Sequence, residues 1–266
     1  MLYILTAVHN RYEITKEFIN NLKKQTYKDY ILVLVDDGST DGTETMVKEN
    51  MPDAVILKGD GNLWWGGGLH KGYKWLKKNA RENDVVLICN DDTYYEENFL
   101  EKGINLLGEQ DSYVLTACGY SVRSGKLIDG AVMFNYSTGI SMVLEPGKEG
   151  NCASTRSIFI PWKVFKKTGG FHPVLLPHYA SDYEFTMRMY RKGFKIKSNA
   201  ELCYKYDEET TGIKDKSKLT LKKIFSKRSM FNPIYKISFI LLATPIKHLP
   251  SHLKNQLKRY RAQLKK

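Results

Sequence analysis

The chain has 266 residues, of which 42% are hydrophobic, 26% charged and 12% aromatic. This composition excludes collagen-like, low-complexity and wholly disordered proteins, and the length allows one large domain with its own core. The four cysteines form no C-x-x-C pair, so a zinc ribbon or a disulfide framework is disfavoured and reduced thiols in the cytosol are expected. The first residues lack the basic segment and cleavage site of a signal peptide.

The positive charge of the chain is concentrated at its C-terminal end. The whole chain has 41 lysines and arginines against 29 acids, a net charge of +12. Residues 213–266 contain 15 basic residues and one acid, whereas residues 1–212 contain 26 basic and 28 acidic residues. A basic face spread over the main domain is therefore disfavoured, and nucleic acid is not an expected partner.

The first part of the chain alternates apolar runs with segments of helical periodicity. Strands are predicted over Leu2–Val8, Tyr30–Val35, Ala54–Leu57 and Val85–Cys89. Helices are predicted between them, over Glu13–Lys24, Thr43–Asn50 and Gly72–Asn79. This alternation is typical of βαβ crossovers and indicates an α/β fold, with a mostly parallel sheet and helices on both faces.

The second part of the chain is less regular. Strands are predicted over Tyr113–Ala117, Ser157–Ile160 and Gly193–Ile196, with a helix over Ser181–Lys192. We predict one domain over residues 1–212, followed by a basic helical tail over residues 213–266.

Two predicted strands end in paired carboxylates, Asp36-Asp37 and Asp91-Asp92. Ligands of such sheets bind at the carboxyl ends of the strands, and adjacent acids need a compensating cation or donor. Either pair alone could simply open a turn and cap a helix, but the two together favour a binding site.

The two acidic segments predict different contacts. The loop that follows Asp37 resembles a calcium loop only in part, because Lys48 occupies the place of the required glutamate. Asp37 instead suits an N–H donor on a planar ring such as a nucleotide base. Asn90, Asp91 and Asp92 suit Mg²⁺ or Mn²⁺ held against a diphosphate, since such ions need few protein carboxylates.

A glycine-rich segment, Asn62–Gly72, reads N-L-W-W-G-G-G-L-H-K-G. Three glycines before a predicted helix would allow close backbone approach and leave helix N–H groups free for an anion. The segment is neither a Walker loop nor a G-x-G-x-x-G motif. Trp64 and Trp65 either pack in the core or form a platform for a sugar ring.

A last segment, Ser181–Gly193, reads S-D-Y-E-F-T-M-R-M-Y-R-K-G. Asp182 could act as a helix cap, with Glu184 in the first turn. The loops before it, Gly169–Pro173 and Pro177–Tyr179, could shape a pocket. The alternative for Asp182 is a catalytic carboxylate.

Taken in this order, the motifs resemble glycosyltransferase family 2, the inverting nucleotide-sugar transferases of the GT-A fold, and most of all its rhamnosyltransferase-like branch. The matching segments are His9-Asn10, Val35–Thr43, Asn62–Gly72, Asn90–Asp92, Gly169–Phe171 and Ser181–Gly193. The likeness extends over Met1–Tyr206. Ser181 and Glu184 replace acids of the family pattern, and the metal triplet begins with Asn90.

The resemblance implies a nucleotide-binding half, an acceptor half and a set of residue roles. Asp182 would be the general base, and Asp92 would hold the metal. Asp37 would contact the base of the nucleotide. The remaining donor contacts would come from Ala7, His9, Asn62, Trp65, Gly67, Asn90 and Asp91.

The expected activity is metal-dependent transfer, with Mn²⁺ or Mg²⁺, of a sugar from a UDP- or dTDP-sugar, dTDP-rhamnose among them. The acceptor would be a hydroxyl of a glycan or lipid-linked acceptor in the synthesis of a cell-surface polysaccharide. One alternative is a nucleotidyltransferase, which should carry a basic phosphate cluster where this chain has only Lys71. A second is a non-catalytic, membrane-bound scaffold or glycan-binding protein, against which the retention of Asp37, Asp92 and Asp182 argues.

The tail lies outside the resemblance. Its apolar stretch Ile234–Ile246 is interrupted by Lys236 and Pro245 and is too short and too charged for a transmembrane helix. A basic segment with aromatic and aliphatic residues suits an anionic membrane surface. We expect a cytoplasmic protein, peripheral at the inner face of the cell membrane. The alternative is a packing arm, such as an element of a homodimer.

Overall fold

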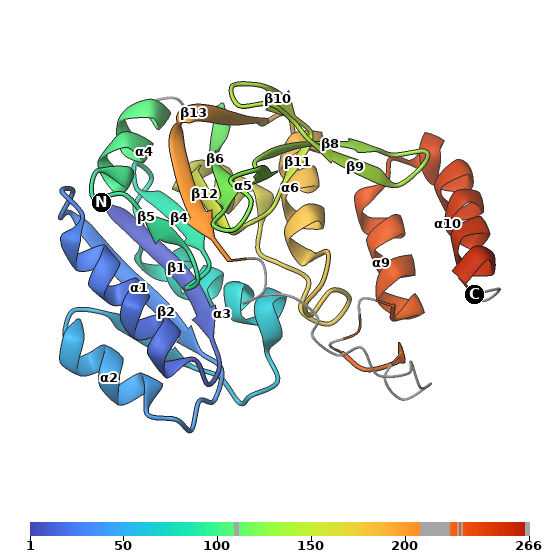
Figure 1. Cartoon of the computed structure of the whole chain (residues 1–266). Coiled ribbons are helices and arrows are strands. Elements are labelled where there is room, and N and C mark those ends of the chain that lie inside the picture. The colour runs from blue at the N-terminus through green and yellow to red at the C-terminus, as the bar shows by residue number, and fades with distance from the viewer. Residues whose placement is uncertain (109–111, 208–223, 228, 230, 264–266) are drawn as a thin grey trace.

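The computed structural model describes residues 1–108, 112–207, 224–227, 229 and 231–263. Figure 1 shows a large central sheet with helices on both faces, and two C-terminal helices at one side of it. Of the predicted tail, residues 213–223, 228, 230 and 264–266 lie outside the described residues.

The N-terminal half is a parallel sheet. Its strands are β1 (Leu2–Val8), β2 (Tyr30–Asp36), β3 (Val55–Lys58) and β4 (Val85–Cys89), in the order β3-β2-β1-β4. Leu5 of β1 lies between Val33 of β2 and Ile88 of β4, and all three pairings along this part of the sheet are parallel. These strands are apolar on both faces because both faces are covered by helices.

Side chains alternate between the two faces of the sheet with a period of two. Leu2 and Ile4 face the helices α1 (Tyr12–Lys24), α2 (Thr43–Asn50) and α4 (Phe99–Leu107). Tyr3 and Leu5 face α3 (Trp64–Asn79), α5 (Trp162–Thr168) and α6 (Ser181–Arg191). The predicted α/β fold with helices on both faces is confirmed.

The other half of the sheet is mixed. β12 (Ser157–Pro161) runs antiparallel between β4 and β6 (Tyr113–Ser121), and β13 (Lys195–Tyr206) pairs in parallel with β6. The short strands β5 (Tyr94–Tyr95), β7 (Leu127–Asp129) and β10 (Glu149–Gly150) add to its edges. A separate antiparallel sheet contains β11 (Cys152–Ala153), β8 (Ala131–Asn135) and β9 (Ile140–Val143).

The described part of the tail packs on this second half. It contains α9 (Pro233–Ala243), a single 3₁₀ turn (Ile246–His248) and α10 (Leu249–Gln263). Phe239 of α9 meets Phe134 of β8 edge to face, with 5.8 Å between ring centroids, and Ala243 is fully buried. α9 therefore shares a small core with the three-stranded sheet and α6, and the ring of His252 in α10 lies 5.8 Å from that of Phe134.

Several elements have bounds that differ from those predicted, most of them by one residue at an end, and β6 extends to Ser121 where the prediction ends at Ala117. Two differences are larger. α3 begins at Trp64 and not at Gly72, because tertiary packing overrides the low helix propensity of its glycines. The late strand is Lys195–Tyr206, much longer than predicted. In the described part of the chain, none of the helices is both long enough and apolar enough to span a membrane.

Candidate active site

The predicted site residues gather at the carboxyl ends of β1, β2 and β4. His9 follows β1, Asp37 follows β2, and Asp91 and Asp92 follow β4. Three non-glycine residues have left-handed backbone conformations, Asn10 (φ 50°), Trp64 (φ 58°) and Ala180 (φ 63°), next to β1, at the start of α3 and before α6. Such conformations cost about 1–3 kcal/mol each and tend to cluster at functional sites.

The carboxylates after β2 organise the loops around them. Asp36 Oδ1 accepts a hydrogen bond from Ser39 N at 2.9 Å. Asp37 is 6% exposed; its Oδ1 accepts from Gly61 N at 2.9 Å, and its Oδ2 from Leu63 N and Trp64 N at 2.9 and 3.0 Å. The carboxylate of Asp37 thus binds the backbone that leads into α3, as a helix cap does. Its contact with a nucleotide base stays a prediction.

The four glycines of the glycine-rich segment lie within α3 and are buried. A Cβ on Gly68 would lie 2.7 Å from the Cβ of Ala7, so α3 packs directly on β1 at this point. Gly66 N donates to Pro177 O at 2.8 Å. The prediction that the N–H groups here remain free for an anion is wrong, because Asp37 and Pro177 already accept from them. Gly67 is buried as well, so its place is in the packing of the helix.

The other predicted donor contacts differ in accessibility. His9 is exposed, and its Nδ1 hydrogen-bonds Asp37 O at 2.6 Å. Asn62 is exposed, and its Nδ2 donates to Asp60 O at 3.4 Å. Ala7 is half-buried beneath α3. His9 and Asn62 are thus the polar members of this set that lie at the surface.

The two tryptophans are largely used in packing. Trp65 is half-buried against the core, and its Nε1 donates to Thr155 Oγ1 at 3.0 Å. The ring of Trp64 lies tilted against that of His178, with 5.7 Å between centroids. Among the described residues, the buried Nε1 of Trp64 has no hydrogen-bond acceptor. Core packing is therefore the better interpretation for Trp65.

The carboxylates after β4 are paired with arginines. Arg11 Nε lies 2.9 Å from Asp91 Oδ1, and Thr15 Oγ1 donates to Asp91 Oδ2 at 2.9 Å. Asp92 Oδ1 accepts a hydrogen bond from Arg156 Nη1 at 3.1 Å, and Asp92 Oδ2 lies 3.5 Å from Arg11 Nη2. Both acids are at most 5% exposed. Burial raises the pKa of Asp91, although Arg11 opposes this. Asn90 is half-buried beside them, and its backbone N donates to Arg156 O.

The carboxylates of Asp91 and Asp92 can be compared with the ligands that a divalent metal ion requires. Mg²⁺ is commonly held by one or two carboxylates, with water and substrate phosphates completing the coordination. Asp92, with Asp91 beside it, meets that requirement. Within the described residues, no three or more His, Cys, Asp or Glu side chains group together to hold an ion by themselves. The residues therefore fit a cation whose coordination a diphosphate completes, with Arg11 and Arg156 as the present counter-charges.

Asp182 lies in the first turn of α6, half-buried. Its Oδ1 accepts from Tyr183 N at 2.8 Å. Burial raises the pKa of its carboxyl to about 6; the Tyr183 N–H opposes this rise, and the charge of Asp129 adds to it. A carboxylate with a pKa near the working pH suits proton abstraction.

Between Asp182 and Asp92 lies a buried group that sequence reasoning missed. Asp129 Oδ2 accepts from Ser154 Oγ and from Tyr204 Oη, each at 2.6 Å. Arg156 Nε lies 3.9 Å from the same oxygen, and its guanidinium lies 4.1 Å from the centre of the Tyr206 ring. Arg156 thus bridges Asp92 and Asp129. Neither Arg156 nor Asp129 belongs to a motif, whereas Arg11 directly follows His9-Asn10 and could have been considered.

Glu184 and Arg188 explain the rest of the last motif. Arg188 Nε and Nη2 donate to the two carboxylate oxygens of Glu184 at 2.8 and 3.0 Å. The same guanidinium donates to Thr168 O and Gly170 O. This buried, bidentate pair fixes the glycine-containing loop to α6 and so sets the position of the helix that carries Asp182.

The α/β sheet, with carboxylates at the carboxyl ends of β2 and β4 and another at the start of α6, has the GT-A fold of glycosyltransferases. The sequence model described as "Glycosyl transferase family 2" matches residues 3–195. The chain belongs to this family.

Two relatives illustrate the range of similarity. The O-antigen chain rhamnosyltransferase WbaN of Salmonella anatum is 24% identical over 208 residues, 73% of this chain and 62% of the relative. An uncharacterized glycosyltransferase of Rickettsia prowazekii is 31% identical over 127 residues, 47% of this chain. The matched part spans only 38% of that relative.

Solved structures share the fold. GalNAc-T7 with UDP, GalNAc and Mn²⁺ has a TM-score of 0.62 at 12% identity, over 78% of this chain and 44% of the other. A mannosyltransferase from Pyrobaculum calidifontis in complex with GDP-Man and Mn²⁺ has a TM-score of 0.56 at 16% identity, over 98% of this chain and 75% of the other. At these identities the likeness is one of fold.

Proposed function

We propose that the chain is a metal-assisted, inverting glycosyltransferase. It moves a sugar from a UDP- or dTDP-sugar, dTDP-rhamnose among the candidates, to a hydroxyl of a glycan or lipid-linked acceptor in the synthesis of a cell-surface polysaccharide. One observation supports this proposal most. Arg156 donates to Asp92, one of the acids after β4, and its charge also acts on the carboxyl of Asp182, whose pKa is raised. Family membership supports the reaction class.

Asp182 is the general base of the proposed reaction. Its carboxylate takes the proton of the acceptor hydroxyl while the hydroxyl oxygen forms a bond to the anomeric carbon of the donor sugar. The bond from that carbon to the diphosphate oxygen breaks, and the nucleoside diphosphate leaves with the electron pair. A single displacement of this kind inverts the anomeric configuration.

The metal would be held by Asp92, with Asp91 and Asn90 in support. When bound, Mn²⁺ or Mg²⁺ supplies stabilisation of the charge that develops on the leaving diphosphate. Arg11 and Arg156 hold Asp91 and Asp92 in place by direct ion pairs. The nucleoside is proposed to lie over the ends of β1 and β2, against His9 and Asn62, which are exposed there.

The remaining donor residues act as supports in this proposal. Asp37 fixes the backbone of residues 61–64, and Ala7 and Gly67 are part of the packing under and within α3. Trp65 is anchored to Thr155. Substitution of Asp37, Ala7 or Trp65 should therefore disturb the shape of the donor site.

Asp182→Asn tests the base. Removal of a general base lowers a rate by about 10²–10⁴-fold, so transfer should fall by that factor. Thermal shifts with UDP or dTDP and Mn²⁺ should be unchanged from those of the native chain. Asp53→Asn, at an exposed acid, is the matched control. Full transfer by Asp182→Asn would contradict the assignment, and shifts with ATP or CTP alone would favour a nucleotidyltransferase.

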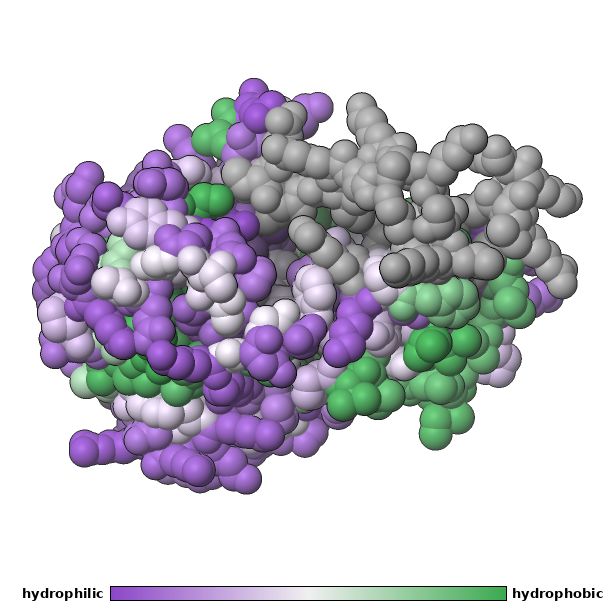
Figure 2. All heavy atoms as spheres, turned by 90° about the horizontal axis from the view of Figure 1, so that it is seen from below, coloured by the Kyte–Doolittle hydropathy of each residue, from purple (hydrophilic) through white to green (hydrophobic). Residues whose placement is uncertain are grey.

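We also propose attachment to the inner face of the cell membrane. α9 exposes Ile234, Ile237 and Leu241, spaced so that they share one helix face. Figure 2 shows apolar side chains gathered at the side of the molecule where α9 and α10 lie. Exposed lysines of the same region, such as Lys254 and Lys258, suit an anionic surface.

Flotation with phosphatidylglycerol vesicles at low salt tests the attachment. The native chain should float, and added salt should release it because screening weakens the charge attraction. The Ile237→Asn variant should float less than the native chain. Thr40→Asn, at an exposed residue in the other half of the molecule, is the control. A chain that stays in solution and sediments as a dimer would instead support the role of the tail as a dimer element.

A further inference from the structure

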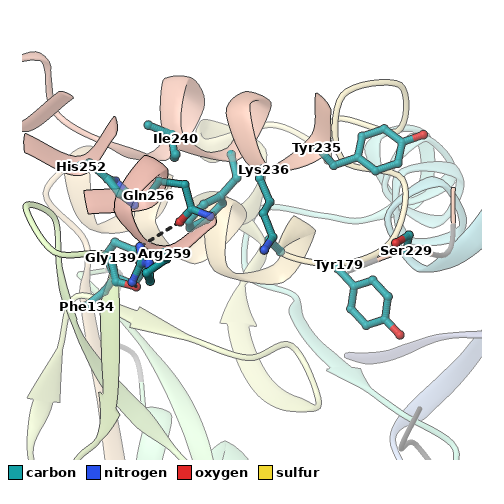
Figure 3. Close-up of a pocket in the computed structure, with 12 residues that line it drawn as sticks. Phe134, Gly139, Tyr179, Ser229, Tyr235, Lys236, Ile240, His252, Gln256 and Arg259 are labelled. Carbon is teal, nitrogen blue, oxygen red and sulfur yellow. Dashed lines mark hydrogen bonds between the residues drawn. The ribbon is translucent and has the colours of Figure 1, made fainter. Parts of the chain in front are cut away.

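A cavity lies between the start of α6, the turn that joins β8 to β9, and the helices α9 and α10. Its volume is about 260 Å³. Figure 3 shows the side chains of Lys236, His252 and Arg259 around it, with Phe134 below and Tyr179 at one end. Small-molecule sites usually have about 300–1,000 Å³, so this cavity suits a head group with a short apolar segment and not a whole glycan.

The polar side of the cavity is cationic. Arg259 donates to Gln256 Oε1 at 2.9 Å and to Gly139 O at 3.4 Å, both uncharged acceptors. Among the described residues that line the cavity, none carries a carboxylate. Burial lowers the pKa of Lys236 and of His252, and the charge of Arg259 lowers both further. The positive charges of Lys236 and Arg259 thus repel each other, and an anion bound between these two side chains would relieve the repulsion.

The other side of the cavity is apolar. Phe134 and Phe239 pack edge to face, and Ile240 is 2% exposed. Gly139, at φ +68°, has no side chain, and a Cβ there would collide with His252 and with the Arg259 guanidinium. The glycine therefore lets α10 approach the turn closely enough to place Arg259 at the cavity. Cations on one wall and aromatic rings on another favour a ligand that is both anionic and apolar.

The cavity adjoins the proposed base. Tyr179 and Ala180 line it, and Asp182 follows two residues later on the same stretch of backbone.

We propose that this cavity binds the phosphate-bearing end of the acceptor, a phosphate ester on an apolar chain, between Lys236 and Arg259. The inference rests on the proposed function, because it specifies the acceptor of that reaction. The phosphate anchors the acceptor beside α6, and the sugar attached to it extends toward Asp182. The chemistry of the cavity, and not that of the donor site, then selects a lipid-linked acceptor.

Calorimetry with octyl phosphate, below its micelle concentration, tests the cavity on the full chain without donor. The native chain should bind it. Loss of one charge-assisted contact should raise the Kd about tenfold or more in Lys236→Gln and in Arg259→Gln. Lys77→Gln, at an exposed lysine of α3 that does not line the cavity, should leave the Kd unchanged. Octanol and inorganic phosphate should each bind at least about tenfold more weakly, since each lacks half of the contacts.

Each alternative outcome is decisive. Equal Kd values for all three lysine and arginine variants would overturn the proposal, as would inorganic phosphate binding as tightly as octyl phosphate. Binding to phosphatidylglycerol vesicles without binding to octyl phosphate would assign the cations to the membrane surface. The comparison of octyl phosphate with octanol on the native chain needs no variant to fold. Asp182→Asn should bind octyl phosphate normally, so loss of transfer and loss of this site are separable.

Discussion

The donor half and the acceptor half of the molecule hold their site residues in different ways. In the donor half, Asp36 binds a backbone N–H three residues away and Asp37 binds one 24 residues away. In the acceptor half, Tyr204 reaches Asp129 across 75 residues, and Arg156 connects that half to Asp92 of the donor half across 64. Arg11 of the donor half likewise reaches Asp91 across 80 residues. The loop after β2 is therefore visible as a sequence motif, whereas the contacts around Asp91, Asp92 and Asp129 form only when the chain has folded.

The largest expected effect breaks the ion pair within the last motif of the acceptor half. Glu184→Ala leaves Arg188, only 15% exposed, without its counter-charge. Removal of one partner of a buried pair lowers the free energy of unfolding by about 3–5 kcal/mol. Urea denaturation measures this, with Glu201→Ala, at an exposed acid, as control. A loss of less than about 1 kcal/mol, the value typical of exposed pairs, would show that the pair does not fix α6.

A smaller effect tests the packing of the donor half. Gly68→Ala gains about 1 kcal/mol of helix propensity but places a Cβ 2.7 Å from that of Ala7, and overpacking costs about 1–3 kcal/mol. The net change should be a loss of up to about 2 kcal/mol. At Gly67 the nearest atom lies at 3.3 Å, so Gly67→Ala should be neutral or stabilising. Equal stability of the two variants in thermal unfolding would contradict the close packing of α3 on β1.

The smallest effect concerns the pH dependence of transfer. Because the pKa of Asp182 is raised to about 6, kcat/KM should fall as the pH drops through that value and the carboxylate takes up a proton. Asp129→Asn removes a negative charge that raises this pKa, while Arg156, which lowers it, remains. The acid limb should therefore move to lower pH. If the acid limb of the pH profile does not move, the charge of Asp129 does not influence the pKa of Asp182. Asp53→Asn is the control.

Much of the fold follows from the sequence because its strands are long apolar runs. β1 and β4 are as predicted, and β2 is longer by one residue, since burial on both faces leaves a clear signal. The sequence does not predict the start of α3, because glycine disfavours helices. The contacts of Gly68 with Ala7 and of Gly66 with Pro177 explain why glycines stand in this helix. The short strands from β7 to β11 carry little periodicity and were not predicted.

The candidate site was predictable to a similar degree. The acids after β4 and Asp182 stand in recognisable motifs. Arg156 and Asp129 do not, and no local pattern connects them with Asp92. The cavity beneath α9 and α10 joins residues from four separate elements, so its cationic wall could not be inferred from the basic tail alone.

The left-handed backbone at Ala180 joins the two sites of the acceptor half. Ala180 lines the cavity, and the helix that starts directly after it carries Asp182. Equilibria that share such a joint are subject to thermodynamic linkage. The proposed phosphate ligand is repelled by an ionised Asp182, so its binding must raise the pKa of Asp182 by the corresponding amount. The affinity for the acceptor and the pKa of Asp182 would then be coupled, so that a substitution that changes one would also change the other.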